Sequence, residues 1–327
     1  MKKLATTFLT IALTITTFTS CSKDDETPIT LPIDPLPSTI TYAQTTVTGT
    51  QFAAVYNHQS IVFNNKLWVI GGRVNNLSTN QIWSSTNGST WTQTTTVGAI
   101  FGNRELQQMV VCNNKLWVIG GLNNGSALND VWSTSDGINW TQETANAQFS
   151  PRSYHEVVVF NNKMWLFGGD DGATKNDIWS SSNGVTWTQE TVVGTHFSSR
   201  AGHQVAVYNN KLYVIGGYGA GGFKNDVWTS TDGLHWREEI VSGAKFSPVY
   251  SHQTVVFNGV LYLIGGDGIA NETWNTIDGK TWKKVAVNAA GFGTVRAGHQ
   301  ALVFNSKICV IGGYSGSTSF NDIWMSN

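Results

Sequence analysis

The chain carries little charge. Only 13% of its 327 residues are Asp, Glu, Lys or Arg, which is half of a typical ~25%. Twenty basic and 21 acidic residues leave a net charge of −1. This balance excludes a disordered acidic or basic tail, and it gives no bulk electrostatic reason to expect nucleic-acid binding.

Helical periodicity is also lacking, because no stretch of residues 42–327 has apolar residues spaced for the buried face of a helix. Glycine is abundant instead, with 34 residues, and there are 14 tryptophans. Both features predict a turn-rich all-β protein. Because 327 residues exceed the common size of one domain, we expect a modular fold.

The first 40 residues predict an export signal followed by a linker. Lys2 and Lys3 precede an uncharged, Thr-rich stretch, residues 4–20. This stretch fits a signal peptide better than a spanning helix, which needs about 20 strongly apolar residues. Residues 27–40 hold four of the six prolines, which predicts a stiff, extended spacer.

The residues around Cys21 resemble the processing site of a bacterial lipoprotein. Phe18-Thr19-Ser20-Cys21 is similar to a lipobox, which implies that Cys21 is lipidated; an ordinary signal peptide with a chance Cys is the alternative. Residues 22–26, SKDDE, resemble the acidic export signal of Bacteroidetes-type surface lipoproteins, although a solvated charge run would look the same. We therefore expect a signal peptide at 1–20, a lipidated linker at 21–40 and a folded domain at 41–327. The resemblance implies an outer-membrane anchor facing the cell surface or the periplasm.

A Gly-Gly pair recurs six times at spacings of 47–49 residues. The pairs are 71–72, 120–121, 168–169, 216–217, 265–266 and 312–313. A His or Gln stands thirteen residues before each pair: His58, Gln107, His155, His203, His252 and His299. Six internal repeats of this length are typical of a β-propeller.

Each repeat divides into four strands, here called a to d. Strand a resembles HQSIVFN (58–64), b KLWVIGG (66–72), c NDVWST (129–134) and d NWTQE (139–143). Asn-Asn or Asn-Gly separates a from b, and Asx-Gly separates c from d. These dipeptides favour two-residue hairpin turns, so they predict antiparallel neighbours. We expect an all-β, six-bladed propeller with four strands in each blade.

The same columns resemble kelch repeats. The shared features are Arg-x-x-His at the start, the Gly-Gly pair, the Asn-Asp-x-Trp element and the following Trp. The resemblance extends over residues 42–327. It implies the propeller fold and leaves function open, since kelch-like propellers serve as enzymes, adaptors and lectin-like binders.

The order of strands predicts how the ring closes. The last repeat ends at Asn327 after strand c, without a strand d. Near the front, Tyr42 precedes His58 by 16 residues, just as Trp91 precedes Gln107. We therefore predict that residues 42–47 supply the outer strand of blade 6, beside residues 323–325, which leaves no open edge.

Most repeated side chains are expected to serve packing. Eleven tryptophans on strands c and d would join neighbouring blades, and six phenylalanines would plug the d–a loops. The His column favours hydrogen bonding between blades over metal binding, because one His per blade does not bring three ligands to one ion. Cys112 and Cys309 are predicted to be buried free thiols. We expect no metal and no cofactor.

The candidate ligand site is a column of arginines at the start of strand a. It comprises Arg104, Arg152, Arg200 and Arg296. Together with Arg73 they are expected to ring the channel mouth and clamp a carboxylate or phosphate. Three acids are further candidates for ligand binding: Asp170, Asp171 and Asp267. Alternatively, each Arg holds its own loop or one of these acids.

Two functions remain open from the sequence. The first is a membrane-anchored, monomeric binding module whose d–a and b–c loops hold a glycan or protein ligand, since loops that vary on a fixed scaffold commonly carry recognition. The second is an enzyme resembling the six-bladed kelch propellers that act as sialic-acid epimerases or mutarotases. That resemblance implies Glu105 or Glu156 as the base beside Arg104, Arg152 or Arg200.

Overall fold

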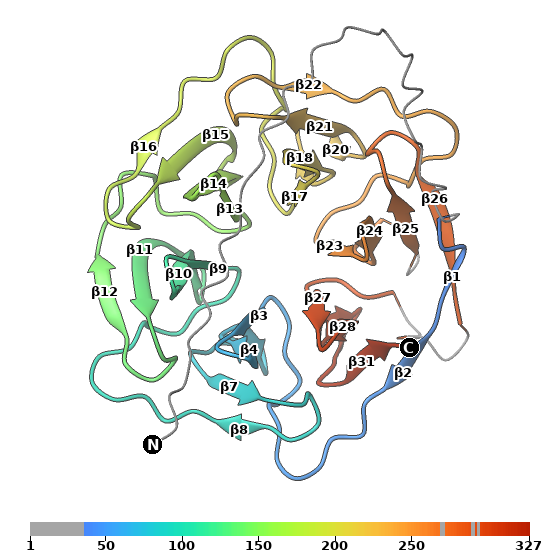
Figure 1. Ribbon diagram of the computed structural model, residues 1–327. Coiled ribbons are helices and arrows are strands. Elements are labelled where there is room, and N and C mark those ends of the chain that lie inside the picture. The colour runs from blue at the N-terminus through green and yellow to red at the C-terminus, as the bar shows by residue number, and fades with distance from the viewer. Residues whose placement is uncertain (1–35, 269–271, 289–291, 293–294) are drawn as a thin grey trace, which may run out of the picture. The chain divides into compact units, whose positions relative to one another are not determined.

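The computed structural model describes residues 36–268, 272–288, 292 and 295–327. The predicted signal peptide, Cys21 and most of the linker lie outside these residues. Within them every regular element is a strand, and six antiparallel sheets form a ring (Figure 1). No helix capable of crossing a membrane occurs in the described part of the chain. The predicted all-β, six-bladed propeller is confirmed.

The strands of each blade run from the channel outwards in the order a to d. Blade 1 contains β3 (Gln59–Phe63), β4 (Lys66–Ile70), β7 (Ile82–Ser85) and β8 (Thr92–Gln93). Blade 2 contains β9 (Gln108–Cys112), β10 (Lys115–Asn123), β11 (Ser126–Thr134) and β12 (Thr141–Thr144). Blade 3 contains β13 (Glu156–Phe160), β14 (Lys163–Asp170), β15 (Thr174–Ser181) and β16 (Thr188–Gln189).

The second half of the ring repeats this order. Blade 4 contains β17 (Gln204–Tyr208), β18 (Lys211–Ile215), β21 (Val227–Ser230) and β22 (Arg237–Glu238). Blade 5 contains β23 (Gln253–Phe257), β24 (Val260–Ile264), β25 (Thr273–Thr276) and β26 (Lys283–Val287). Blade 6 contains β27 (Gln300–Phe304), β28 (Lys307–Ile311) and β31 (Ile323–Ser326), and its outer strand comes from the front of the chain.

The a–b turns show why the residues there specify antiparallel neighbours. Asn64 and Asn65 both have positive φ, 49° and 57°, as the two central residues of a type I′ hairpin turn require. The turn sets Phe63 opposite Lys66. The b–c loops of three blades carry further short hairpins: β5 (Arg73–Val74) with β6 (Leu77–Ser78), β19 (Tyr218–Gly219) with β20 (Gly222–Phe223), and β29 (Tyr314–Ser315) with β30 (Thr318–Ser319).

Closure follows the prediction. Strand β2 (Tyr42–Gln44) pairs antiparallel with β31, with Tyr42 opposite Ser326 and Gln44 opposite Trp324. The backbone continues the contact, since Thr45 N–H donates to the carbonyl of Ile323 at 2.8 Å. In Figure 1 the blue β2 lies beside the red β31. The ring is therefore joined by main-chain hydrogen bonds between the two ends of the propeller.

The propeller begins earlier than expected. Strand β1 (Thr39–Ile40) pairs parallel with β26 and gives blade 5 a fifth strand. The compact unit starts at Leu36, so residues 36–40, assigned above to the linker, belong to the fold. No turn residues in the sequence predict this strand, because a parallel strand added to a sheet edge needs no hairpin.

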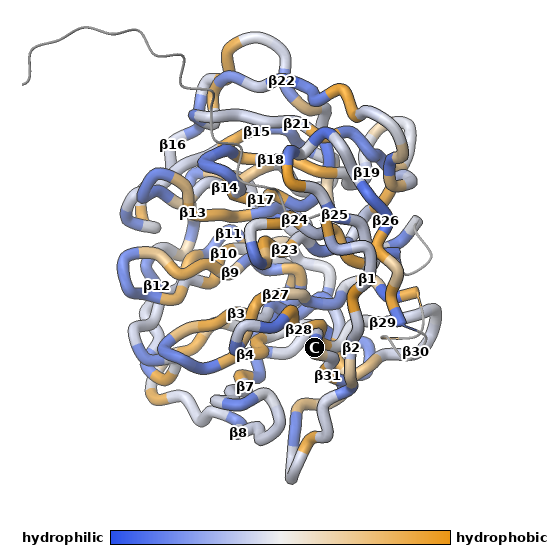
Figure 2. The backbone as a smooth tube through the Cα atoms, turned by 45° about the vertical axis from the view of Figure 1, so that its right-hand side comes forward, coloured by the Kyte–Doolittle hydropathy of each residue, from blue (hydrophilic) through white to orange (hydrophobic). Residues whose placement is uncertain are grey.

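Among the residues that the structure describes, the hydrophobic core is divided into six clusters, one at each interface between neighbouring blades. The cluster at the closure joins Phe304 and Ile311 of blade 6 to Leu67, Trp83 and Trp91 of blade 1. In Figure 2 hydrophobic stretches accordingly occur all around the propeller rather than at one centre. Each blade therefore buries hydrophobic side chains against both of its neighbours, as expected for a repeat fold.

The Gly-Gly pairs are explained by close approach of the backbone to the His column, both within a blade and between neighbouring blades. A Cβ on Gly72 would lie 2.6 Å from the Cβ of His58 in its own blade, and a Cβ on Gly312 would lie 2.9 Å from Cε1 of the same His58. Both glycines also have positive φ. Only glycine fits between the His columns of adjacent blades.

Candidate functional site

The channel mouth is formed by two residues from each blade. One precedes the His or Gln column by two positions, the other follows the Gly-Gly pair, and the two face each other in a β-bridge. These pairs, which we call the mouth, are Tyr56–Arg73, Glu105–Leu122, Ser153–Asp170, Ala201–Tyr218, Tyr250–Asp267 and Ala297–Tyr314. Backbone pairing thus places these twelve residues at equivalent positions in the six blades. Four of them are buried: Glu105, Ser153, Ala201 and Ala297.

Aromatic side chains gather at this opening. The rings of Tyr56 and Tyr314 lie 4.9 Å apart, although they belong to blades 1 and 6. Tyr250 stacks on Phe223 at 5.3 Å and lies 6.4 Å from Tyr218. Tyr218 is 48% exposed and Phe223 is 41% exposed. The group was not predicted from the sequence, because each of the two mouth positions is Tyr in only two of the six repeats.

The arginine column does not form the expected clamp. Arg104, Arg152, Arg200 and Arg296 are each at most 1% exposed. Each guanidinium is bidentate to an Asp of its own blade, at 2.5–2.9 Å: Asp130, Asp177, Asp226 and Asp322. Each also donates to the carbonyl of the first glycine of the Gly-Gly pair. Because their guanidinium N–H groups are already bonded inside the blade, these side chains cannot clamp a ligand in this conformation.

The second interpretation of the column, in which each Arg holds its own loop and an acid, therefore describes the structure, but with a different acid. The partner is the Asp of the Asn-Asp-x-Trp element, which also accepts a hydrogen bond from the c-strand Trp, as Asp226 does from Trp228 at 2.8 Å. Burial opposes ionisation of Asp226, yet the hydrogen bonds from Arg200 hold its pKa below the usual value.

The correct partner was visible in the sequence. Blades 1 and 5 lack the Arg, with Val55 and Val249 in its place, and the same two blades lack the Asp, with Gln81 and Glu272. The four blades that have the Arg all have the Asp. The two positions thus change together within one chain, as paired residues do.

The acids near the mouth have separate partners. Asp171 accepts from Ser150 Oγ at 2.8 Å and pairs with Lys175 at 3.0 Å. Asp170 accepts the N–H of Gly172. Asp267 lies 3.5 Å from the hydroxyl of Tyr314, and burial raises the pKa of its carboxyl. Within the described residues, the arginine column pairs with none of these three acids.

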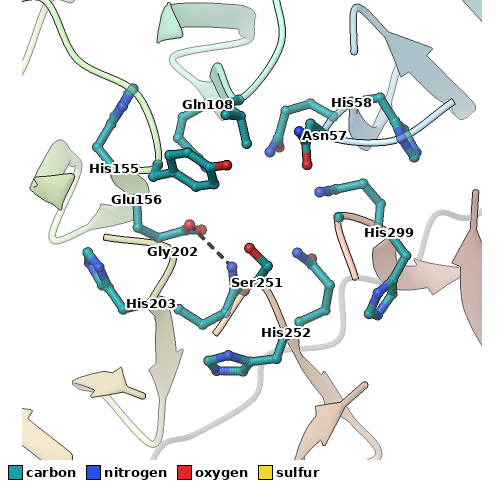
Figure 3. A pocket seen from close by; sticks show the side chains of 17 residues that line it. Asn57, His58, Gln108, His155, Glu156, Gly202, His203, Ser251, His252 and His299 are labelled. Atoms are coloured by element: carbon teal, nitrogen blue, oxygen red, sulfur yellow. Dashed lines mark hydrogen bonds between the residues drawn. The ribbon is translucent and has the colours of Figure 1, made fainter. Parts of the chain in front are cut away.

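The two candidate bases lie in different settings. Glu105 is 2% exposed and pairs with Arg73 at 3.1 Å, while Asn57 Nδ2 donates to its other oxygen at 3.0 Å. Glu156 lines the channel (Figure 3). Neither carboxyl shares an open site with Arg104, Arg152 or Arg200, because those guanidinium groups are buried.

The channel itself is narrow. Its cavity measures about 50 Å³, against the 300–1,000 Å³ of typical small-molecule pockets. The His column surrounds the channel. Figure 3 shows five of its residues around the opening: His58, His155, His203, His252 and His299. The described residues contain no cluster of three or more His, Cys, Asp or Glu suited to a metal. The channel is therefore smaller than a typical ligand pocket.

The five histidines are buried between the blades. The ring nitrogens of all five have no well-aligned hydrogen-bond partner within the described structure, although the backbone of Ile119 and Ile264 in the neighbouring blade lies close enough to His155 and His299 to act on their pKa values, in the raising direction. The predicted bond between blades is made at Gln107, whose Nε2 donates to the carbonyl of Ile70 at 2.9 Å. Burial lowers the pKa of four of the histidines, His58, His155, His252 and His299, to about 3.

Other packing predictions are confirmed. Cys112 and Cys309 are free and buried. The six loop phenylalanines are at most 2% exposed: Phe52, Phe101, Phe149, Phe197, Phe246 and Phe292. Five of them contact the d-strand Trp of the blade that they enter, with ring centroids 4.9–5.3 Å apart.

Comparison with protein families identifies the repeats. Residues 133–288 match the model described as KLHDC2/KLHL20/DRC7 Kelch-repeats domain, and residues 107–133 match the Kelch motif. A search of curated proteins found no match. The two family matches together cover blades 2 to 5, and the structure extends the same repeat to blades 1 and 6.

Proposed function

We propose that this kelch-repeat propeller is a binding module that holds a protein ligand at the mouth. Kelch propellers commonly act as protein-binding modules. The observation that carries the proposal is the aromatic group of the mouth, Tyr56, Tyr218, Tyr250, Tyr314 and Phe223.

Tyrosines suit this role because each offers a large apolar face and a hydroxyl at low conformational cost. Aromatic residues and Arg are enriched in the cores of protein interfaces. The mouth supplies polar groups beside them, with Asp267 next to Tyr314 and Arg73 opposite Tyr56. A ligand that buries Tyr218 and Phe223 gains apolar contact without moving the blades.

We further propose that the module is anchored to the outer membrane through Cys21 and displayed at the cell surface. The lipobox-like run FTSC, the SKDDE run and the proline-rich spacer support this placement. The spacer would hold the propeller away from the lipid, where the mouth can reach a partner.

The mutarotase alternative gains no support from the site. It requires a carboxylate and an Arg that together face the substrate, whereas Glu105 is already paired with Arg73 and Glu156 lies in a channel of about 50 Å³. Incubation with sialic acid followed by NMR of anomer exchange tests it directly, and we expect no acceleration.

The binding proposal is tested with residues 22–327, which retain the whole unit from Leu36 to Asn327. The chain is screened against panels of immobilised extracellular proteins and against glycan arrays. Once a ligand is found, Tyr218→Ala and Phe223→Ala should each weaken binding by tenfold or more without changing the melting temperature. Ile138→Ala is the control, since Ile138 is 39% exposed in a c–d turn at the opposite end of the blade.

Binding to glycans alone would replace the protein ligand by a glycan at the same surface. Binding to neither class would remove the proposal, and so would full affinity in both mouth variants.

A further inference from the structure

A ring of five amides and one carboxyl lines the channel. The six side chains are the first residues of the six innermost strands, one from each blade: Gln59, Gln108, Glu156, Gln204, Gln253 and Gln300. Figure 3 shows the Glu156 carboxylate pointing into the opening that Gln108, Asn57 and Ser251 also face. The ring is independent of the mouth and of its ligand.

Glu156 has no cationic partner among the described residues. None of the described Lys or Arg side chains lines the channel, and the surrounding His rings are neutral near pH 7, since burial lowers the pKa of His155 and His252 to about 3. The carboxylate receives one hydrogen bond from the described part of the chain, from Gln204 Nε2 at 3.3 Å. Glu156 is only partly buried, and desolvation raises the pKa of its carboxyl above the usual value.

Backbone contacts determine how two of the amides are turned. Thr254 N–H donates to Gln204 Oε1 at 3.2 Å, so the Gln204 amino group faces Glu156. Ser60 N–H donates to Gln300 Oε1 at 3.4 Å. The side chains of Gln59, Gln108 and Gln253 make no hydrogen bond to other described residues, so their carbonyl oxygens are free to turn into the channel.

The size of the cavity limits its occupant. A water molecule needs about 10–15 Å³ of such a cavity, so the cavity of about 50 Å³ admits an ion with a few waters. Larger organic cations do not fit. The occupant that satisfies a single carboxylate in this space is therefore small and positively charged.

We propose that the channel binds one monovalent alkali-metal cation, Na⁺ or K⁺, coordinated by the Glu156 carboxylate and by side-chain amide oxygens of the ring. One negative charge balances a monovalent ion, and neutral carbonyl oxygens replace its hydration shell as they do in ion-selective pores. Ca²⁺ sites draw on several carboxylates, and the ring has one. Because the ligands come from separate blades, the ion links blades across the channel.

Thermal unfolding tests the proposal. The chain of residues 22–327 is melted at pH 7.5 and constant ionic strength in NaCl, in KCl and in N-methyl-D-glucamine chloride, whose cation is too large for the cavity. In NaCl or KCl the melting temperature should be a few degrees higher and should rise with salt concentration to a plateau. Equal melting in all three salts, as expected for a protonated Glu156, would overturn the proposal.

Two variants locate the site. Glu156→Gln completes a ring of six amides and should fold but lose the dependence on Na⁺ or K⁺, whereas the control Glu190→Gln, on the outer side of blade 3, should keep it. Gln253→Glu adds a second carboxylate and should gain stabilisation by Ca²⁺ that the wild type lacks. Retention of the cation effect in Glu156→Gln, or no Ca²⁺ response in Gln253→Glu, would show that the ring is not the ligand set.

A crystal soaked in RbCl gives a direct readout. An anomalous peak in the channel within coordination distance of Glu156 is expected in the wild type. Its absence there, or its presence in Glu156→Gln, would contradict the assignment.

Discussion

Tyr42 and Phe292 stand 250 positions apart in the chain, yet their rings lie edge to face at 5.1 Å and 75°. The pair repeats the contact that Phe246 makes with Trp282 in blade 5 at 5.0 Å. Tyr42 thus takes the place of the d-strand Trp that blade 6 lacks. The front of the propeller is not an appendage but a structural part of its last blade.

Closure can be weakened at this one side chain. Tyr42 is 1% exposed, and truncating a buried aromatic residue to Ala costs about 3–5 kcal/mol. We therefore expect Tyr42→Ala to lower the free energy of unfolding by that amount in urea denaturation. Gln44→Ala, on the same strand but exposed, should change it little. Equal stability of the two variants would mean that β2 does not hold the ring closed.

The Arg–Asp pairs should behave as units. Removing one partner of a buried ion pair leaves an uncompensated charge and costs about 3–5 kcal/mol, so Asp226→Gln alone should be strongly destabilising. Blade 1 shows a neutral alternative with Val55 and Gln81. The double variant Arg200→Val, Asp226→Gln should therefore recover most of the loss in a urea-denaturation cycle. Additive losses would indicate that the two residues act separately.

The buried histidines predict acid sensitivity. Burial lowers the pKa of His252 to about 3, while an unfolded His titrates near 6.5. Because the unfolded chain then binds the extra proton, stability is full above pH 6.5 and falls as pH drops towards 3. For each such His, the free energy of unfolding should fall by about 2 kcal/mol as the pH is lowered from 7 to 5.

A variant that copies blade 2 isolates one of these histidines. Blade 2 carries Gln107 at the same position, so His252→Gln should fold and should lose less stability between pH 7 and pH 5 than the wild type in urea titrations. Glu156 acts in the opposite direction, since its pKa is raised, but it is present in both proteins and cancels in the comparison. If His252→Gln loses as much stability between pH 7 and pH 5 as the wild type, His252 is not a source of the acid sensitivity.

Lipidation should depend on a single residue. Expressed in a Gram-negative host, the wild type is expected in the membrane fraction with a diacylglycerol-modified N-terminus by mass spectrometry, whereas Cys21→Ser should be found unmodified and soluble. Surface exposure is then measured by protease accessibility on intact cells. A wild-type protein without lipid would leave an ordinary signal peptide as the correct interpretation.

The architecture was predictable because it depends on local, countable signals. The Asn-Asn turns, the alternating strands and the six Gly-Gly pairs determine hairpins and their number, since turn chemistry and a two-residue strand period act over a few residues. Closure followed from matching Tyr42 to Trp91 by spacing. The parallel strand β1 escaped prediction, because its pairing with β26 depends on no turn.

The orientation of the arginine column was mispredicted for a physical reason. Position in a repeat tells which strand end carries Arg200, but whether its side chain reaches the channel or turns into its blade depends on where Asp226 lies in the folded sheet. Comparison of all six repeats would have revealed that pairing. No such comparison reveals the aromatic group at the mouth, because Tyr56 and Tyr314 occupy different positions in their repeats.

The amino-acid sequence by itself determined a closed ring of six blades, the tryptophans and glycines between them and the free thiols, because these follow from periodic patterns and turn residues. Only the tertiary structure decided which charges are buried in pairs, which aromatic rings meet at the mouth and that Glu156 stands alone among five amides. The reason is that residues from separate blades converge on one axis, and their distances depend on the twist and tilt of every blade in the ring.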